Sequence, residues 1–149
     1  MRTLIVYDSV YGNTEIIAKA IGDAVTGEVI VLRVGDVDSS KLETFDLLIV
    51  GSPTHGGRPT EAIRDFLEQA PLPAFKGANV AAFDTRMKPK LARILGFAAG
   101  RIAGSLKKKG AALIGSPEGF FVEGAEGPLT EGEVERAAAW ARQIVKGTE

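Results

Sequence analysis

The feature that most constrains this chain is an alternation of short apolar runs with segments of helical periodicity. Apolar, β-branched runs predict buried strands, and apolar residues three and four positions apart predict amphipathic helices. Strands that alternate with helices predict a parallel sheet with right-handed crossovers and helices on both faces. We therefore expect an α/β fold, a doubly wound five-stranded parallel sheet in a three-layer sandwich. The expected strands are residues 2–8, 28–34, 46–52, 78–83 and 111–116, and the expected helices are residues 13–25, 60–70, 89–109 and 131–146.

One stretch of the pattern allows two interpretations. Gly115, Pro117 and Gly119 interrupt residues 113–122, which form either one broken strand or a strand followed by a loop. The chain shows no internal repeat, low-complexity tract or linker, so we expect one domain over residues 1–149. In the last expected helix, the residues predicted to face the core are Val134, Ala137, Ala138, Ala141, Ile144 and Val145.

The absence of cysteine excludes several classes of chemistry. Disulfides, thiolate metal sites, iron–sulfur clusters and thiol nucleophiles all require cysteine. His55 is the only histidine, so a metal site built on several histidines is excluded as well. No apolar run reaches the roughly 18 residues of a membrane span, and the N-terminal segment has the pattern of a strand rather than of a signal peptide. We therefore expect a cytoplasmic protein without a transmembrane segment.

The expected topology places a ligand site at one edge of the sheet. In doubly wound folds, ligands bind beyond the carboxyl ends of the strands, at the point where the strand order reverses. Residues 9–14, 52–59 and 84–89 follow the first, third and fourth expected strands. These three loops are therefore the predicted site.

The first of these loops, Ser9-Val10-Tyr11-Gly12-Asn13-Thr14, has the chemistry of an anion site. It joins a strand to the start of a helix, where free backbone N–H groups and the positive end of the helix dipole favour a phosphate. Gly12 permits close approach of the backbone, and Ser9, Asn13 and Thr14 add neutral donors. The loop lacks the Gly-Lys-Ser/Thr of a nucleotide P-loop and the Gly-x-Gly-x-x-Gly of a dinucleotide fold. It predicts a site for one terminal phosphate, the alternative being an ordinary turn with an Asn or Thr helix cap.

The first loop is similar to the flavodoxin phosphate loop, Thr-x-Thr-Gly-Asn-Thr, with Ser9 and Tyr11 in place of the two leading threonines. The order of expected strands and helices resembles a short-chain flavodoxin over nearly the whole chain. The resemblance implies the strand order 2-1-3-4-5, and it implies that Ser9 to Thr14 bind the phosphate of FMN. Tyr11 departs from the flavodoxin pattern, and the Tyr11-Gly12 pair resembles the quinone-reductase branch of the same superfamily.

The second loop, residues 51–59, is rich in glycine and proline and resembles the first flavin-ring loop of flavodoxins. The resemblance implies that Pro53-Thr54-His55 contacts the flavin, with His55 in the place where many flavodoxins have tryptophan. It also implies that Gly56 or Gly57 lets the backbone flip toward N5 of the reduced flavin, since glycine tolerates both backbone states. The alternative for His55 is an exposed loop histidine without chemistry.

The third loop, residues 83–87, lies where flavodoxins often stack a tyrosine on the flavin, but it contains no tyrosine. Asp84, Thr85 and Arg86 can instead bond the pyrimidine edge of the ring. Arg86 would also place a positive charge beside the reduced flavin and favour reduction, a hypothesis whose alternative is a surface Asp84–Arg86 ion pair of little energetic value. The aromatic residues that can shield the ring, or else belong to the core, are Phe83, Phe97, Phe120 and Phe121.

A basic segment follows the third loop. Between Thr85 and Pro117 the chain has eight basic residues and no acidic one, although the net charge of the whole chain is −1. Such a segment attracts the phosphates of NADPH, an acidic protein or an anionic membrane surface, whereas nucleic acid is not expected because no aromatic residues interleave the lysines. Gly96, Gly100 and Gly104 share one face of the expected helix. They indicate either close packing on the sheet or a contact in a homo-oligomer.

These observations and the resemblance predict an FMN-binding redox protein that carries electrons through a non-covalently bound flavin. The first alternative is an FMN-dependent NAD(P)H:quinone or nitro oxidoreductase, and the second is a flavodoxin-like module without flavin. The expected partners are a redox protein, or NAD(P)H together with a quinone-type acceptor.

Overall fold

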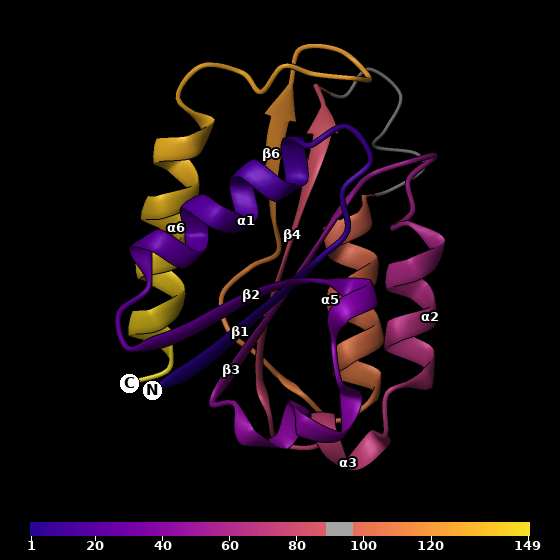
Figure 1. The fold of residues 1–149 in the computed structure, drawn as a ribbon, viewed down its shortest axis with the longest axis vertical. Coiled ribbons are helices and arrows are strands. Elements are labelled where there is room, and N and C mark those ends of the chain that lie inside the picture. Colours follow the sequence, from indigo (N-terminus) through magenta and orange to yellow (C-terminus); the bar gives the residue numbers. More distant parts are fainter. Residues whose placement is uncertain (89–96) are drawn as a thin grey trace.

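A parallel sheet with the strand order β2-β1-β3-β4-β5 forms the centre of the protein (Figure 1). The computed structural model describes residues 1–88 and 97–149. The order and the parallel pairing confirm the α/β fold and the 2-1-3-4-5 arrangement that the sequence predicts. The strands are β1 (Arg2–Tyr7), β2 (Glu28–Arg33), β3 (Leu47–Pro53), β4 (Asn79–Met87), β5 (Ala112–Leu113) and β6 (Glu118–Val122).

The fifth strand of the sheet is broken into β5 and β6. β3 occupies one edge of β4, while β5 pairs with the first two residues of β4 and β6 pairs with its last five. β5 and β6 therefore share the other edge of β4 as two pieces of one strand. Gly115, at φ +66°, lies in the break, and a Cβ at this position would come within 2.8 Å of the Ile144 side chain. The expectation of a continuous strand over residues 111–116 is wrong, and the alternative of a broken strand is confirmed.

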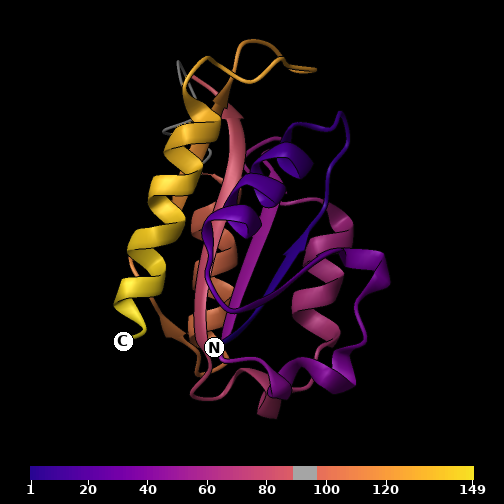
Figure 2. The same ribbon diagram turned by 60° about the vertical axis from the view of Figure 1, so that its left-hand side comes forward.

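Two pairs of helices cover the two faces of the sheet. α1 (Asn13–Ala24) and α6 (Glu133–Gly147) lie on one face, and α2 (Glu61–Gln69) and α5 (Ala98–Lys108) lie on the other (Figures 1 and 2). α3 (Leu72–Phe75) is a single turn. Two 3-10 turns that the sequence does not predict, η1 (Val34–Asp36) and η2 (Ser39–Thr44), join β2 to β3. None of the helices in the described residues is long and apolar enough to cross a membrane.

Alternating residues of the strands divide the core into two parts. In β1, Leu4 and Val6 pack with α2 and α5, whereas Ile5 and Tyr7 pack with α1 and α6. β3 is buried along almost its whole length, as its continuous apolar run predicts. Both helical layers are therefore attached to the sheet by the same central strands.

An aromatic cluster fills the part of the core beside α6. The rings of Phe83, Phe120 and Trp140 meet edge to face, with centroids 6.1–6.2 Å apart. The Phe83 ring lies against Gly51, where a Cβ would overlap it, so this contact requires glycine in β3. Phe83 and Phe120 are thus core residues. Trp140 is buried although the sequence does not predict it, and Val134, which is predicted to face the core, is 40% exposed.

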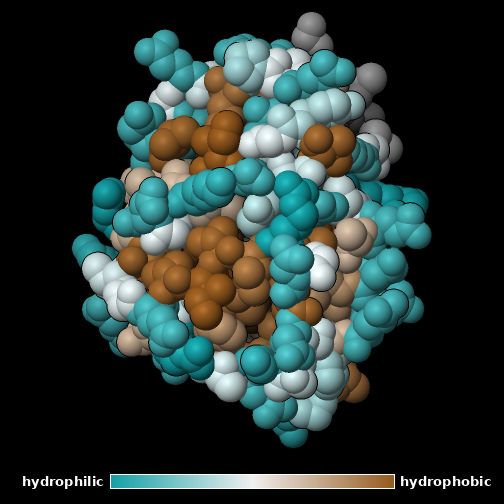
Figure 3. Space-filling model, viewed as in Figure 1, coloured by the Kyte–Doolittle hydropathy of each residue, from teal (hydrophilic) through white to brown (hydrophobic). Residues whose placement is uncertain are grey.

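The β2 edge of the sheet is only partly covered. Val29, Ile30, Val31 and Leu32 are each half-buried, and Figure 3 shows apolar surface gathered over this edge. The 3-10 turns that follow β2 are shorter than a covering helix, which leaves these side chains accessible.

The basic segment contains α5, which confirms the predicted helix over residues 98–108. The expectation of one helix over residues 89–109 is wrong at Phe97, which is extended and precedes α5 as its N-cap. Residues 89–96, and with them Gly96, lie outside the residues that the structure describes. A Cβ at Gly100 or Gly104 would meet no heavy atom of another part of the protein within 4 Å. Close packing on the sheet is therefore the wrong explanation for these two glycines, and a contact in a homo-oligomer stays a prediction.

An ion-pair network around the buried carboxylate of Glu133 joins the start of α6 to β6. Arg136 donates to the two carboxylate oxygens of Glu133 at 2.9 and 2.6 Å and to Glu118 at 3.0 Å. Glu133 also accepts a hydrogen bond from the backbone N–H of Phe121 at 2.7 Å. The hydrogen bond from Arg136 is the main cause that lowers the pKa of Glu133, and burial opposes it. Because the pKa is lower in the folded protein, the carboxylate stabilises the fold above its unfolded pKa and loses this contribution as the pH falls.

We expect Glu133→Gln to lower the free energy of unfolding by about 2 kcal/mol at pH 7, because charge-assisted bonds are lost. The difference from the parent should shrink below about pH 4, where the carboxyl group of an unfolded glutamate becomes protonated. Urea denaturation at several pH values measures both effects. Glu135→Gln removes an exposed carboxylate in the same helical turn and should cost less than about 0.5 kcal/mol. Equal costs for the two variants at pH 7 would contradict the role of the network.

Candidate functional site

A cavity of about 330 Å³ lies at the carboxyl ends of the parallel strands, where the sequence predicts the site. The loop after β1, the end of β3 with the loop after it, and the last three residues of β4 form most of its wall, and the end of β6 with the chain after it completes it. The expected end of the fourth strand at residue 83 is wrong, because β4 continues to Met87 and includes residues 84–87 of the third loop. The sheet order reverses between β1 and β3 at this point, which is where doubly wound folds bind ligands, so we call it the switch-point cavity. The lining residues are Ser9, Val10, Tyr11, Asn13, Thr14, Pro53, Thr54, His55, Thr85, Arg86, Met87, Val122 and Ala125.

The residue that precedes α1 is a glycine, which provides no side-chain cap. Gly12 precedes the helix at φ +94°, a left-handed conformation that glycine adopts without strain, and it offers no capping hydrogen bond. Ser9 Oγ accepts from the Gly12 N–H at 3.1 Å and from the Glu15 N–H, in the first turn of α1, at 3.4 Å. Thr60 accepts from the Ile63 N–H in the first turn of α2 at the same distance. Neither Asn13 nor Thr14 caps α1, so the Asn or Thr cap of the alternative is wrong, and both residues line the cavity beside the positive end of the helix.

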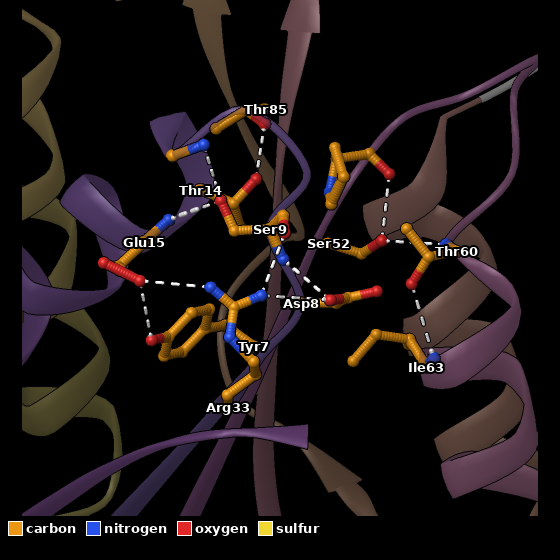
Figure 4. Close-up of polar contacts among 12 residues, drawn as sticks. Tyr7, Asp8, Ser9, Thr14, Glu15, Arg33, Ser52, Thr60, Ile63 and Thr85 are labelled. Carbon is orange, nitrogen blue, oxygen red and sulfur yellow. Dashed lines mark hydrogen bonds and ion pairs between the residues drawn. The ribbon is translucent and has the colours of Figure 1, made fainter. Parts of the chain in front are cut away.

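Arg33, the last residue of β2, bonds to the first loop, which follows the neighbouring strand β1 (Figure 4). Its guanidinium donates to the Ser9 carbonyl at 2.9 Å and to Glu15 at 3.2 Å, and it lies 3.5 Å from Asp8. Tyr7 donates to the same oxygen of Glu15 at 3.2 Å. This hydrogen bond is the main cause that lowers the pKa of Glu15, while burial is the main cause that raises the pKa of Tyr7. The sequence predicts only neutral donors here and misses Arg33, which offsets part of the negative charge beside the loop.

A hydrogen bond between two buried hydroxyl groups joins the first loop to the third. Thr14 Oγ1 lies 2.7 Å from Thr85 Oγ1, and both side chains are almost fully buried at the cavity wall (Figure 4). Either hydroxyl group can donate. When Thr85 donates, Thr14 keeps its own proton for a ligand.

Two side chains hold the ends of the second loop. Ser52 is fully buried, and its hydroxyl group donates to the Pro53 carbonyl at 2.9 Å. The same hydroxyl oxygen accepts from the N–H of Thr60, the residue that caps α2, at 3.0 Å (Figure 4). Thr54 donates its N–H to the Thr85 carbonyl at 2.9 Å, and its hydroxyl accepts from the Ala98 N–H at 3.0 Å. The second loop is therefore attached to α2, β4 and α5 at once.

His55-Gly56-Gly57-Arg58 forms a tight turn beside the switch-point cavity. His55 and Arg58 exchange both backbone hydrogen bonds, at 2.9 and 3.0 Å. Gly56 and Gly57 have φ values of +58° and +77°, as a primed hairpin turn requires. Arg101 Nε donates to the Gly57 carbonyl at 2.8 Å, whereas a Cβ at Gly56 would meet no atom within 4 Å. The geometry favours Gly56 for the predicted flip, because the carbonyl of Gly57 is already bonded.

The Asp84–Arg86 ion pair is present, but it is buried and does not lie on the surface. Asp84 is fully buried, and Arg86 Nε and Nη2 each donate to its carboxylate at 2.7 Å. The Ala99 N–H, in the first turn of α5, donates to the same carboxylate at 2.9 Å. The guanidinium stacks on Phe97, with Cζ 3.5 Å from the ring centroid, and lies against Gly119, where a Cβ would overlap it. The positive charge predicted at the cavity wall is therefore balanced by Asp84.

The structure brings most of the predicted contact residues together. Gly12, Gly56, Gly57 and Asp84 do not line the cavity: the glycines shape the backbone beside it, and Asp84 holds Arg86. The aromatic side chains among the described lining residues are those of Tyr11 and His55, and none of the four phenylalanines suggested as shields lines the cavity.

Two lining residues lie outside the three predicted loops, and a third was not assigned a contact. Met87, which is 51% exposed, ends the predicted third loop but was not named among the residues that contact the ring. Val122 and Ala125 come from the end of β6 and the chain after it, where the broken strand gives no clear pattern. Asn13 Nδ2 donates to the carbonyl of Glu126 at 3.2 Å and attaches this segment to the first loop.

A parallel sheet of order 2-1-3-4-5, with helices on both faces and a cavity at its switch point, defines a flavodoxin-like protein. A family model described as Flavodoxin domain matches residues 4–105, more than half of the chain. The chain therefore belongs to the flavodoxin-domain family, whose members bind FMN. Membership assigns it a flavin-binding role in electron transfer.

Solved structures of flavodoxins share the fold over nearly the whole chain. A flavodoxin from the domain Archaea has a TM-score of 0.84 at 21% sequence identity, with 99% of each chain covered. Oxidised Flavodoxin 2 from Bacillus cereus has a TM-score of 0.77 at 27% identity, over 98% of this chain and 99% of that one. A flavodoxin, WrbA-like protein from Agrobacterium tumefaciens has a TM-score of 0.76 at 17% identity, over 99% of this chain and 96% of that one. A search of curated protein sequences finds no match.

Arg86→Ala should lower the free energy of unfolding by about 3–5 kcal/mol, because it leaves the buried carboxylate of Asp84 without its partner. Lys19→Ala is the control, since the Lys19–Glu15 ion pair is exposed and its loss should cost less than about 1 kcal/mol. Urea denaturation followed by circular dichroism gives both values. If the two variants lose equal stability, the buried pair does not have the role described.

Proposed function

We propose that this protein is an electron carrier that binds FMN in the switch-point cavity. The observation that carries the proposal is the start of α1, where Gly12 adopts φ +94° and Ser9, Asn13 and Thr14 line the cavity. This arrangement suits a terminal phosphate, and the adjoining cavity of about 330 Å³ is within the usual size of a ligand site. Membership of the flavodoxin-domain family supports FMN as the ligand.

FMN supplies one- and two-electron chemistry when it is bound, and the chain supplies binding and orientation. Ser9, Asn13 and Thr14 would hold the phosphate together with the backbone N–H groups of the first loop. Thr85 supports this contact, since a hydrogen bond donated to Thr14 leaves the Thr14 proton for the phosphate. His55 and the other lining residues of the second and third loops would hold the ring.

A reductase is the second candidate, and the sparse aromatic lining of the switch-point cavity favours it. Tyr11 and His55 provide the aromatic surface among its described lining residues, and Tyr11 is 53% exposed. A flavin ring that few aromatic side chains cover is accessible to a small second substrate. The overall reaction would then convert NAD(P)H, a proton and a quinone to NAD(P)⁺ and a quinol.

The phosphate assignment predicts a preference for FMN over riboflavin, which lacks the phosphate. Thr14→Val should raise the dissociation constant for FMN at least about tenfold, because a charge-assisted hydrogen bond is lost, and leave that for riboflavin unchanged. Flavin fluorescence quenching measures both constants. Thr26→Val, at an exposed position outside the switch-point cavity, is the matched control. An equal loss of affinity for both flavins would place the phosphate elsewhere.

The carrier assignment predicts that the FMN-loaded protein reduces a quinone with NADPH no faster than free FMN does. A reductive titration should then show two separated one-electron steps. Turnover at least about tenfold above that of free FMN, which corresponds to about 1.4 kcal/mol of barrier lowering, would assign the reductase instead. A protein that is colourless as purified and fails to take up added FMN would contradict both functions.

A further inference from the structure

A second cavity, of about 660 Å³, lies between α2 and α5. Its lining is strongly basic: Arg58, Arg64, Arg101 and Lys109 contribute four positive charges and Glu68 contributes one negative charge, which leaves a balance of +3. We call it the α2/α5 groove. The proposed electron carrier does not by itself require such a groove.

Two of these cations lack a partner of opposite charge. Arg58 and Arg64 are exposed, and neither forms an ion pair with a carboxylate in residues 1–88 and 97–149. Lys109, in contrast, donates to the carbonyls of Leu67 and Glu68 at the C-terminal end of α2, where the helix dipole favours a cation. The groove therefore holds positive charge that the described part of the protein does not balance.

The donors of the groove suit an extended phosphate-bearing anion. Arg101, Ser105 and Lys109 are spaced by four residues along α5 and its C-cap, so they form one row about 12 Å long. Guanidinium groups match the geometry of phosphate oxygens and bind them in pairs. Pro59 and Leu67 add apolar lining beside this row. We propose that the α2/α5 groove binds a small molecule that carries a pyrophosphate group.

The His55–Arg58 turn couples this groove to the switch-point cavity. His55 lines the switch-point cavity, and Arg58 lines the groove. Arg101, also in the groove, donates to the Gly57 carbonyl of the turn at 2.8 Å. An anion that binds Arg58 and Arg101 changes the forces that hold the turn. This coupling rests on the proposed function: if FMN contacts the turn, FMN and the anion change each other's affinity by the same factor.

Titration calorimetry of the FMN-loaded protein with inorganic pyrophosphate tests the groove. We expect binding that Arg64→Gln weakens at least about fivefold, because a phosphate-binding guanidinium is lost. Lys107→Gln, which removes an exposed cation of α5 outside the groove, should change the affinity less than about twofold through screened long-range charge alone. Absence of binding, or equal effects of the two variants, would overturn the site. Tighter binding of a hexaglutamate peptide than of pyrophosphate would assign the groove to an acidic protein segment and overturn it as well.

The dissociation constant for FMN, measured with and without saturating pyrophosphate, tests the coupling. We expect a change of about threefold in the parent and in Lys107→Gln, and no change in Arg101→Gln. An unchanged constant in the parent overturns the coupling. Pyrophosphate binding is measured by heat and does not require flavin, so a protein that binds pyrophosphate but not FMN contradicts the proposed function and leaves the groove supported.

Discussion

The buried carboxylate of Asp84 joins the end of β4 to the start of α5 beside the switch-point cavity. It pairs with Arg86 at the wall of the switch-point cavity and accepts the Ala99 N–H in the first turn of α5. A charge removed from water needs such partners, because desolvation costs several kcal/mol per ion. Arg86 can therefore lie beside a ligand without adding net charge. Asp84 and Thr54 together set where α5 begins, and α5 in turn provides one wall of the α2/α5 groove.

The helix starts at this edge of the sheet differ in the groups that bond their first N–H groups, and this difference supports the proposed place of the phosphate. Parallel strands all end at the same edge, so the helices that follow them begin there together. Thr60 caps α2, and Thr54 and Asp84 bond the first N–H groups of α5. α6 begins with the carboxylates of Glu133 and Glu135, which repel an anion. α1 also has a carboxylate in its first turn, Glu15, but Arg33 pairs with it, and Ser9, Asn13 and Thr14 place hydroxyl and amide groups at the cavity beside the glycine start of this helix.

The helical periodicity predicts which segments are helices better than it predicts their buried faces. Ile63, Phe66 and Leu67 of α2 are buried as expected. Val134 of α6 is exposed instead, and Trp140 takes its place in the core. Spacing in the sequence defines a face about 100° wide, but the angle at which a helix lies on the sheet decides which edge of that face is covered. The break between β5 and β6 has a similar origin, because it depends on the contact of Gly115 with Ile144 of α6.

The sequence by itself determined the order of strands and helices, the sheet order through a family resemblance, and the three loops that meet at the switch point. These features depend on neighbours along the chain: periodicity, a glycine before a helix, and hydroxyl or amide side chains in one turn. Only the tertiary structure decided that Arg33 supports Ser9, that Asp84 and Arg86 are buried, and that Arg101 bonds Gly57. Arg33 and Arg101 reach partners more than twenty residues away in the sequence, and the burial of Asp84 depends on α5 packing over β4. The distances between such groups are set by how the helices and strands pack, because no local pattern of residues records them.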